Sequence, residues 1–180
     1  MNHLNKNDLI DIKTLIPNIF LDIRYATTNN FTGKKHYAKP VCFLKTELVK
    51  QLQKVQEILN KENLSLKIWD GYRPKSVHSD FTKYCEDTSY VPTISNHSKG
   101  ICIDLTICTL DGIDLDMPTD FDDFSKKAHS NSADINETQK QNRYKLINLM
   151  HKFGFTVSET EWWHFDYFAL LDSEILDVLI

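Results

Sequence analysis

Apolar residues recur at helical spacing in three parts of the chain. In KTELVKQLQKVQEILNKE (45–62) they follow steps of four, three and four residues, which predicts one apolar stripe along a helix. A similar spacing in SVHSDFTKYCE predicts a second helix over 76–86. Asn136 and Gln139 resemble a capping box and predict a third helix that ends at Gly154. Its expected apolar face holds Tyr144, Ile147 and Met150.

Strands are predicted where apolar and polar residues alternate. SLKIWD (65–70) has this pattern, and so has the stretch 101–108, in which isoleucine and leucine alternate with small or polar residues. We expect 155–157 and 161–168 to pair as strands, and LDSEILDVLI (171–180) to form a short terminal helix. Helices and strands without regular alternation favour an α+β fold, with a small, mostly antiparallel sheet flanked by helices.

The length of 180 residues predicts a single domain over 1–180, because domains hold about 150 residues. Hydrophobic residues make up 41% of the chain, enough for one core. A stretch without periodicity, 110–136, contains seven aspartates. Loops of this length in compact domains are usually functional or mobile, and a solvated acidic loop is the equal alternative.

The charge balance argues against several classes of partner. There are 21 basic and 25 acidic residues, and the basic ones are dispersed, so we expect no nucleic-acid partner. No apolar run approaches the ~20 residues of a membrane span. The first twenty residues lack a secretory signal pattern, which predicts a cytoplasmic protein, with export by another route as the alternative. Four cysteines without a C-x-x-C pair are expected to be reduced, buried thiols, although Cys102 and Cys108 could lie near a site.

Two short segments carry residues suited to metal chemistry. In SNHSKGICID, Asp104 follows His97 by seven residues and stands among apolar neighbours, where a carboxylate is costly to bury unless it pairs or binds a metal. The alternative is a carboxylate that reaches solvent from a sheet face. In ETEWWHFDY, Glu161 and His164 are three residues apart, and a regular strand would place them on opposite faces. Both can serve one site only if the chain bends between them.

These residue types match a hydrolytic zinc site. His97, Asp104 and His164 would supply three nitrogen and oxygen ligands and leave a fourth position open, as in catalytic zinc sites. Glu161 could then take a proton from the activated water. Arg73, in the turn DGYRP, offers a cation for an oxyanion or a substrate carboxylate, and an ordinary surface ion pair is the alternative.

Three motifs in order, DGYRP, SNHSKGICIDLTI and EWWHFDY, resemble the zinc D-alanyl-D-alanine dipeptidases of the VanX type. DIRYATTNNFTG, MPTDFDDF and NETQKQNRYKLINLMHKFGF are also similar to that family, so the resemblance covers most of 20–168. It implies that His97, Asp104 and His164 bind one Zn²⁺ at the sheet face. It further implies that Glu161 is the general base and then the acid, and that Arg73 stabilises the tetrahedral transition state.

The resemblance also gives the acidic loop a purpose. It implies that Asp122 holds the substrate ammonium group and that Ser95 lies near the substrate carboxylate, although Asp123 stands next to Asp122. An aspartate that faces a free amine in a closed cavity would reject acylated, longer substrates. The expected reaction is hydrolysis of D-Ala-D-Ala to two D-alanines. The alternatives are a D,D-carboxypeptidase or cell-wall endopeptidase with the same metal site, and a zinc-stabilised binding domain without turnover.

Overall fold

A five-stranded sheet forms the centre of the computed structural model, which describes residues 9–85, 87 and 90–180. In order across the sheet, the strands are β2 (Phe20–Leu21), β4 (Leu64–Asp70), β5 (Cys102–Thr109), β7 (His164–Asp166) and β6 (Thr156–Val157). The β2–β4 pair is parallel, and the other three pairs are antiparallel. A separate antiparallel pair joins β1 (Leu9–Asp11) to β3 (Phe43–Lys45). The predicted α+β class with a mostly antiparallel sheet is confirmed.

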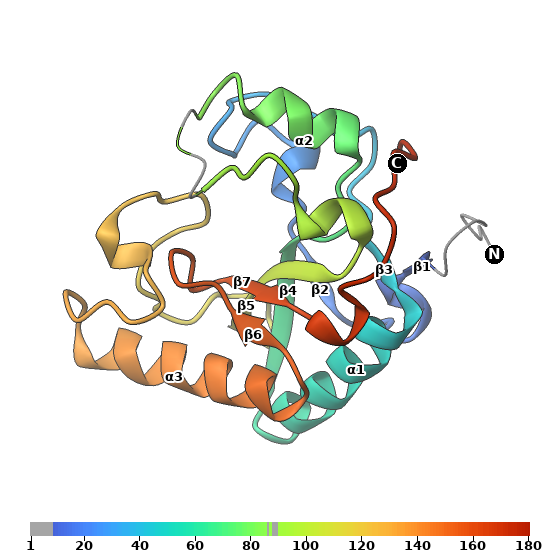
Figure 1. Ribbon diagram of the computed structural model, residues 1–180. Coiled ribbons are helices and arrows are strands. Elements are labelled where there is room, and N and C mark those ends of the chain that lie inside the picture. Colours follow the sequence, from blue (N-terminus) through green and yellow to red (C-terminus); the bar gives the residue numbers. More distant parts are fainter. Residues whose placement is uncertain (1–8, 86, 88–89) are drawn as a thin grey trace.

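Three α-helices lie on the two sides of this sheet. They are α1 (Thr46–Lys61), α2 (Lys75–Phe81) and α3 (Glu137–Lys152). Figure 1 shows α1 and α3 along one side and α2 on the other. Single 3-10 turns connect the larger elements: η1 (Ile12–Thr14), η2 (Arg24–Ala26), η3 (Asn96–Lys99), η4 (Lys126–Ala128) and η5 (Phe168–Leu170). In the described part of the chain, no helix combines the length and apolar character needed to cross a membrane.

The predicted helix boundaries hold where a cap or an apolar stripe defines them. The apolar stripe of α1 is buried along its whole length. α3 begins with the predicted capping box, in which the Asn136 side chain accepts a hydrogen bond from the Gln139 N–H group at 2.9 Å. The prediction of its apolar face is partly wrong, because the Tyr144 side chain is 69% exposed. Leu146 and Met150, one turn apart, are the buried residues of the helix instead.

Two other predictions differ from the structure. The second helix ends at Phe81 rather than 86, and Glu86 lies outside the described residues. The terminal helix predicted over 171–180 is wrong. The Lys75 N–H group donates to the Leu176 carbonyl at 3.1 Å, and Leu176 N–H donates to the Ser98 carbonyl at 2.8 Å. These tertiary hydrogen bonds hold the segment outside a helix, and ten residues are too few for a stable isolated helix.

β5 places the polar side of the sheet beneath loops rather than in solvent. Ile103, Leu105 and Ile107 join the apolar core, as their alternation predicts. The opposite face is buried as well, because Asp104 is 3% exposed and Cys102 is fully buried. The alternative in which Asp104 simply reaches solvent is therefore excluded.

Candidate active site

A cavity of about 210 Å³ lies on the polar face of β5 and β7. It brings together every predicted site residue: Arg73, Ser95, His97, Asp104, Asp122, Glu161 and His164. These side chains come from the turn after β4, from η3, β5 and β7, and from loops before and after α3. Side chains from separate strands and loops therefore meet at one site.

His97 stands in a 3-10 turn whose two ends are defined by local chemistry. The Ser95 hydroxyl group accepts a hydrogen bond from the His97 N–H at 3.2 Å, and Gly100 closes the turn with a left-handed φ of 69°. The His97 Nδ1 atom donates to the Gly71 carbonyl at 2.6 Å. Because a carbonyl only accepts, this contact places the proton of a neutral ring on Nδ1, so Nε2 is the nitrogen that would bind a metal.

Asp104 and His164 face each other across the sheet, since they are register partners on β5 and β7. The His164 Nδ1 atom lies 2.9 Å from Asp104 Oδ1. The His97 Nε2 atom lies 3.3 Å from His164 Nδ1 and 3.3 Å from Asp104 Oδ2. Zinc bonds of about 2.0–2.1 Å in a tetrahedron place ligand atoms about 3.3 Å apart. The three side chains therefore fit a tetrahedral metal with one position left open.

The Nε2 atom of His164, across the ring from the Nδ1 atom that faces Asp104, lies near a carboxylate. This nitrogen lies 3.5 Å from Asp166 Oδ1, and the Asn96 amide donates to the same oxygen at 2.9 Å. Carboxylates behind metal-binding histidines orient the ring and raise its basicity. Sequence reasoning did not single out Asp166 for this role, although it stands two residues after His164 and therefore on the same strand face.

Glu161 reaches the cavity because the chain bends before β7. The His164 N–H group donates to the Glu161 carbonyl at 3.2 Å, so a tight turn spans the two residues. The chain therefore bends between Glu161 and His164, as is required if both residues are to serve one site. Burial raises the pKa of the Glu161 carboxyl group to about 7, although the charge of His164 opposes the shift.

Arg73 is fixed in place by buried partners. Its Nε and Nη2 atoms donate to the same Asp70 oxygen at 2.9 and 2.8 Å, and its guanidinium group lies 4.9 Å from the Tyr25 ring centroid. Burial acts to lower the pKa of Arg73, but Asp70 raises it well above its usual range. Arg73 is 7% exposed, which excludes an ordinary surface ion pair. Its Nη2 atom lies 3.9 Å from Asp104 Oδ2, so the cation borders the predicted metal site.

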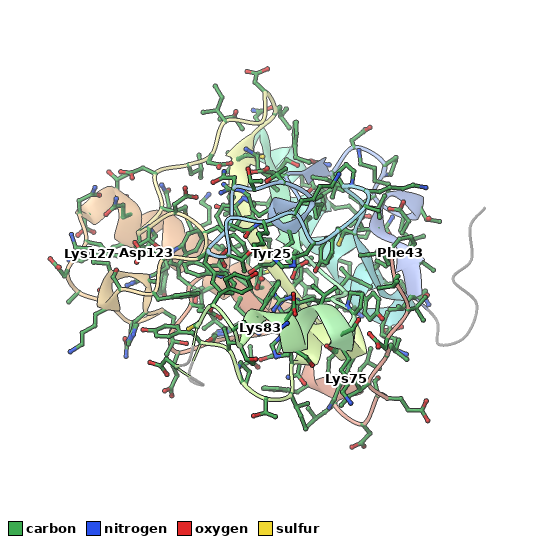
Figure 2. All side chains as sticks on the ribbon, turned by 90° about the horizontal axis from the view of Figure 1, so that it is seen from above. Tyr25, Phe43, Lys75, Lys83, Asp123 and Lys127 are labelled. Carbon is green, nitrogen blue, oxygen red and sulfur yellow. The ribbon has the colours of Figure 1, made fainter. Side chains whose placement is uncertain are left out.

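Asp122 closes the other side of the cavity, and Asp123 does not line it. The Asp122 carboxylate accepts hydrogen bonds from the Tyr25 hydroxyl group and from the Phe31 N–H, each at 3.0 Å. Asp122 adopts a left-handed φ of 61°, a conformation that aspartate tolerates. Asp123 accepts from Ser125 N–H at 2.7 Å, and in Figure 2 it lies beside Lys127, away from Tyr25.

Electrostatics distinguish Asp122 from an ordinary surface carboxylate. Burial raises its pKa to about 7, although the two hydrogen bonds that it accepts act in the opposite direction. A partly desolvated carboxylate is therefore available to a cation that enters the cavity. Tyr25 and Phe31, which sequence reasoning gave no individual role, belong to the DIRYATTNNFTG segment that resembles the dipeptidases.

Comparison with known proteins assigns the family. A family model described as D-ala-D-ala dipeptidase matches residues 5–179. The chain belongs to this family of peptidases.

Two relatives that are similar to most of this chain are named D-alanyl-D-alanine dipeptidase. The chain is 33% identical over 162 residues to the D-alanyl-D-alanine dipeptidase of Escherichia coli (strain K12), covering 88% of this chain and 84% of the relative. It is 33% identical over 168 residues to the D-alanyl-D-alanine dipeptidase of Enterococcus faecium, covering 80% and 83%. The solved structure of the LD-carboxypeptidase LdcB superposes with a TM-score of 0.52 at 17% identity, covering 92% of this chain and 70% of the other, and supports the fold alone.

Proposed function

We propose that this protein hydrolyses D-Ala-D-Ala to two D-alanines with one zinc ion. The observation that carries the proposal is the set of His97 Nε2, His164 Nδ1 and the Asp104 oxygens, 2.9 to 3.3 Å apart, in a cavity that also holds Glu161 and Arg73. A bound zinc ion would lower the pKa of a water molecule and polarise the scissile carbonyl group. Family membership supports the same reaction.

Glu161 is the residue suited to move the proton. With a pKa near 7, its carboxylate can accept a proton from the attacking water and return it to the nitrogen of the leaving amine. Its position in the bend before β7 keeps it beside His164 without making it part of the strand. We assign Glu161 as general base and then general acid.

Arg73 is the residue suited to stabilise negative charge. Its guanidinium group is held rigidly by Asp70 and stacked on Tyr25, so it needs little reorganisation as an oxyanion develops. Ser95, which also lines the cavity, is proposed to lie near the substrate carboxylate.

Asp122 is proposed to bind the free ammonium group of the dipeptide. An acylated or longer substrate brings no positive charge to this position and would leave a desolvated carboxylate unpaired. Such an unpaired polar group disfavours the wrong substrate strongly. The site therefore selects a free dipeptide over a peptide within the cell wall. We also propose that the enzyme acts in the cytoplasm, which subcellular fractionation would test.

The decisive experiment measures D-alanine release by the zinc-loaded protein from D-Ala-D-Ala and from N-acetyl-D-Ala-D-Ala in parallel. We expect cleavage of the free dipeptide and little of the acetylated one. Preferred cleavage of the acetylated substrate would support a carboxypeptidase or endopeptidase instead. Zinc binding without cleavage of either substrate would support a binding domain.

A further inference from the structure

Cys102 is a buried thiol that lies against the proposed metal site. It stands two residues before Asp104 on β5, so both side chains point to the same face of the sheet. Its register partner on β7 is Asp166, two residues beyond His164. The Cys102 Sγ atom and one ring nitrogen each of His97 and His164 all lie within 4.8 Å of one another.

The surroundings of Cys102 are not those of a core cysteine. Its side chain is fully buried, yet it is not part of the apolar cluster that contains Ile103 and Leu105. Ring nitrogens of His97 and His164 lie close to its sulfur, and Asp166 is its register partner on β7. Sulfur in such a position can bind a metal, because neutral histidine and a thiolate are ligands that zinc and softer ions accept.

The two histidines therefore belong to two overlapping donor sets. One set is completed by the oxygen atoms of Asp104, and the other by the sulfur of Cys102. Oxygen ligands suit harder ions, whereas thiolate selects softer ones. The choice between the two sets then depends on which metal enters.

We propose that Cys102 is a metal ligand that, with His97 and His164, gives the site a sulfur-containing donor set for soft divalent ions such as Cd²⁺. When the sulfur–metal bond forms, the thiol releases its proton to solvent, so binding consumes no oxidant or other reactant. The inference rests on the histidine metal site of the proposed function. It adds a metal preference that the three predicted ligands alone would not confer.

The test titrates Cd²⁺ into the metal-free full-length protein and follows the thiolate-to-cadmium absorption band in the ultraviolet. Indicator competition measures the dissociation constants for Cd²⁺ and Zn²⁺. The variants are Cys102→Ser, which keeps the size of the side chain, and Cys102→Ala. Cys108→Ala is the matched control, since Cys108 is buried on the same strand and the same face but does not belong to the donor group of Cys102, His97 and His164. Circular dichroism and thermal melting identify variants that remain folded.

We expect one equivalent of Cd²⁺ to produce the band in the native protein and in Cys108→Ala, and not in either Cys102 variant. The Cd²⁺ dissociation constant should rise at least roughly tenfold in the folded Cys102 variants, with a smaller change for Zn²⁺. Cadmium binding by the native protein without the band, or a band that persists in Cys102→Ser, would overturn the proposal. Dipeptide hydrolysis by the zinc-loaded native protein tests the proposed function separately, so failure of one leaves the other measurable.

Discussion

The Tyr25 hydroxyl group donates a 3.0 Å hydrogen bond to Asp122, which stands 97 residues further along the chain. The ring of the same tyrosine lies 4.9 Å from the Arg73 guanidinium group. One buried side chain therefore contacts both the carboxylate proposed to bind the substrate amine and the cation proposed to stabilise the transition state. Tyr25 sets the spacing between the two charges, so we class it as a positioning residue.

Replacing Tyr25 with phenylalanine should weaken amine binding while preserving the ring beside Arg73. A hydrogen bond to a charged group contributes about 1.5–3 kcal/mol, so we expect KM for D-Ala-D-Ala to rise roughly tenfold or more with a smaller change in kcat. Steady-state kinetics measure both. Tyr37→Phe is the control, because Tyr37 donates to Asp70 rather than to Asp122. An unchanged KM in Tyr25→Phe would show that the hydrogen bond does not position Asp122.

The raised pKa of Asp122 predicts how stability depends on pH. The unfolded chain releases this proton near the usual aspartate value, whereas the folded protein keeps it until the pH approaches about 7. The folded state therefore binds more protons between these values, and the stability contribution falls as the pH rises through this window. Asp122→Asn removes this titration. Above pH 7, the free energy of unfolding of the variant should therefore exceed that of the native protein by up to a few kcal/mol, since one pKa unit corresponds to about 1.4 kcal/mol.

Urea unfolding of the metal-free proteins at pH 4 and pH 8 checks this difference. Asn tolerates the left-handed backbone at this position, so the substitution adds little strain. Asp123→Asn is the matched control, because no cavity contact is lost. A stability difference between Asp122→Asn and the native protein that is the same at both pH values would contradict the prediction.

Substitutions at Glu161 and at His164 should have different effects on turnover and on metal binding. Glu161→Ala is expected to abolish hydrolysis while the protein keeps its zinc, because the carboxylate moves a proton and is not needed as a ligand. His164→Ala should lose zinc affinity, because it removes one of three donor atoms. Zinc content after dialysis and D-alanine release measure the two effects. Equal zinc loss in both variants would instead make Glu161 a ligand.

Arg73→Ala should lower kcat by roughly 10²–10³, the usual effect of removing one oxyanion donor. The loss should fall on kcat because the group acts most strongly on charge that develops in the transition state. Arg73→Lys keeps the charge but cannot reproduce the paired contacts to Asp70, so we expect only partial activity. A change confined to KM would assign Arg73 to ground-state binding of the substrate.

Local patterns were enough to predict several elements because their causes are local. The apolar stripe of α1, the capping box of α3 and the alternation of β5 each depend on residues within a few positions of one another. The terminal segment 171–180 was predicted wrongly for the opposite reason. Its backbone partners, Ser98 and Lys75, are far away in the sequence, and no periodicity reveals them.

By itself, the sequence determined the family and the candidate site residues, because His97, Asp104, Glu161 and His164 stand in short motifs of fixed spacing. The tertiary structure alone decided which groups surround them. It set Asp122, the aspartate that the resemblance already indicated, against the cavity, and it placed Tyr25 between two charges. It also brought Cys102 close to His164 through the register of β5 and β7, and close to His97 through the packing of η3. Such choices depend on contacts between distant segments, and those form only when the sheet and its loops pack together.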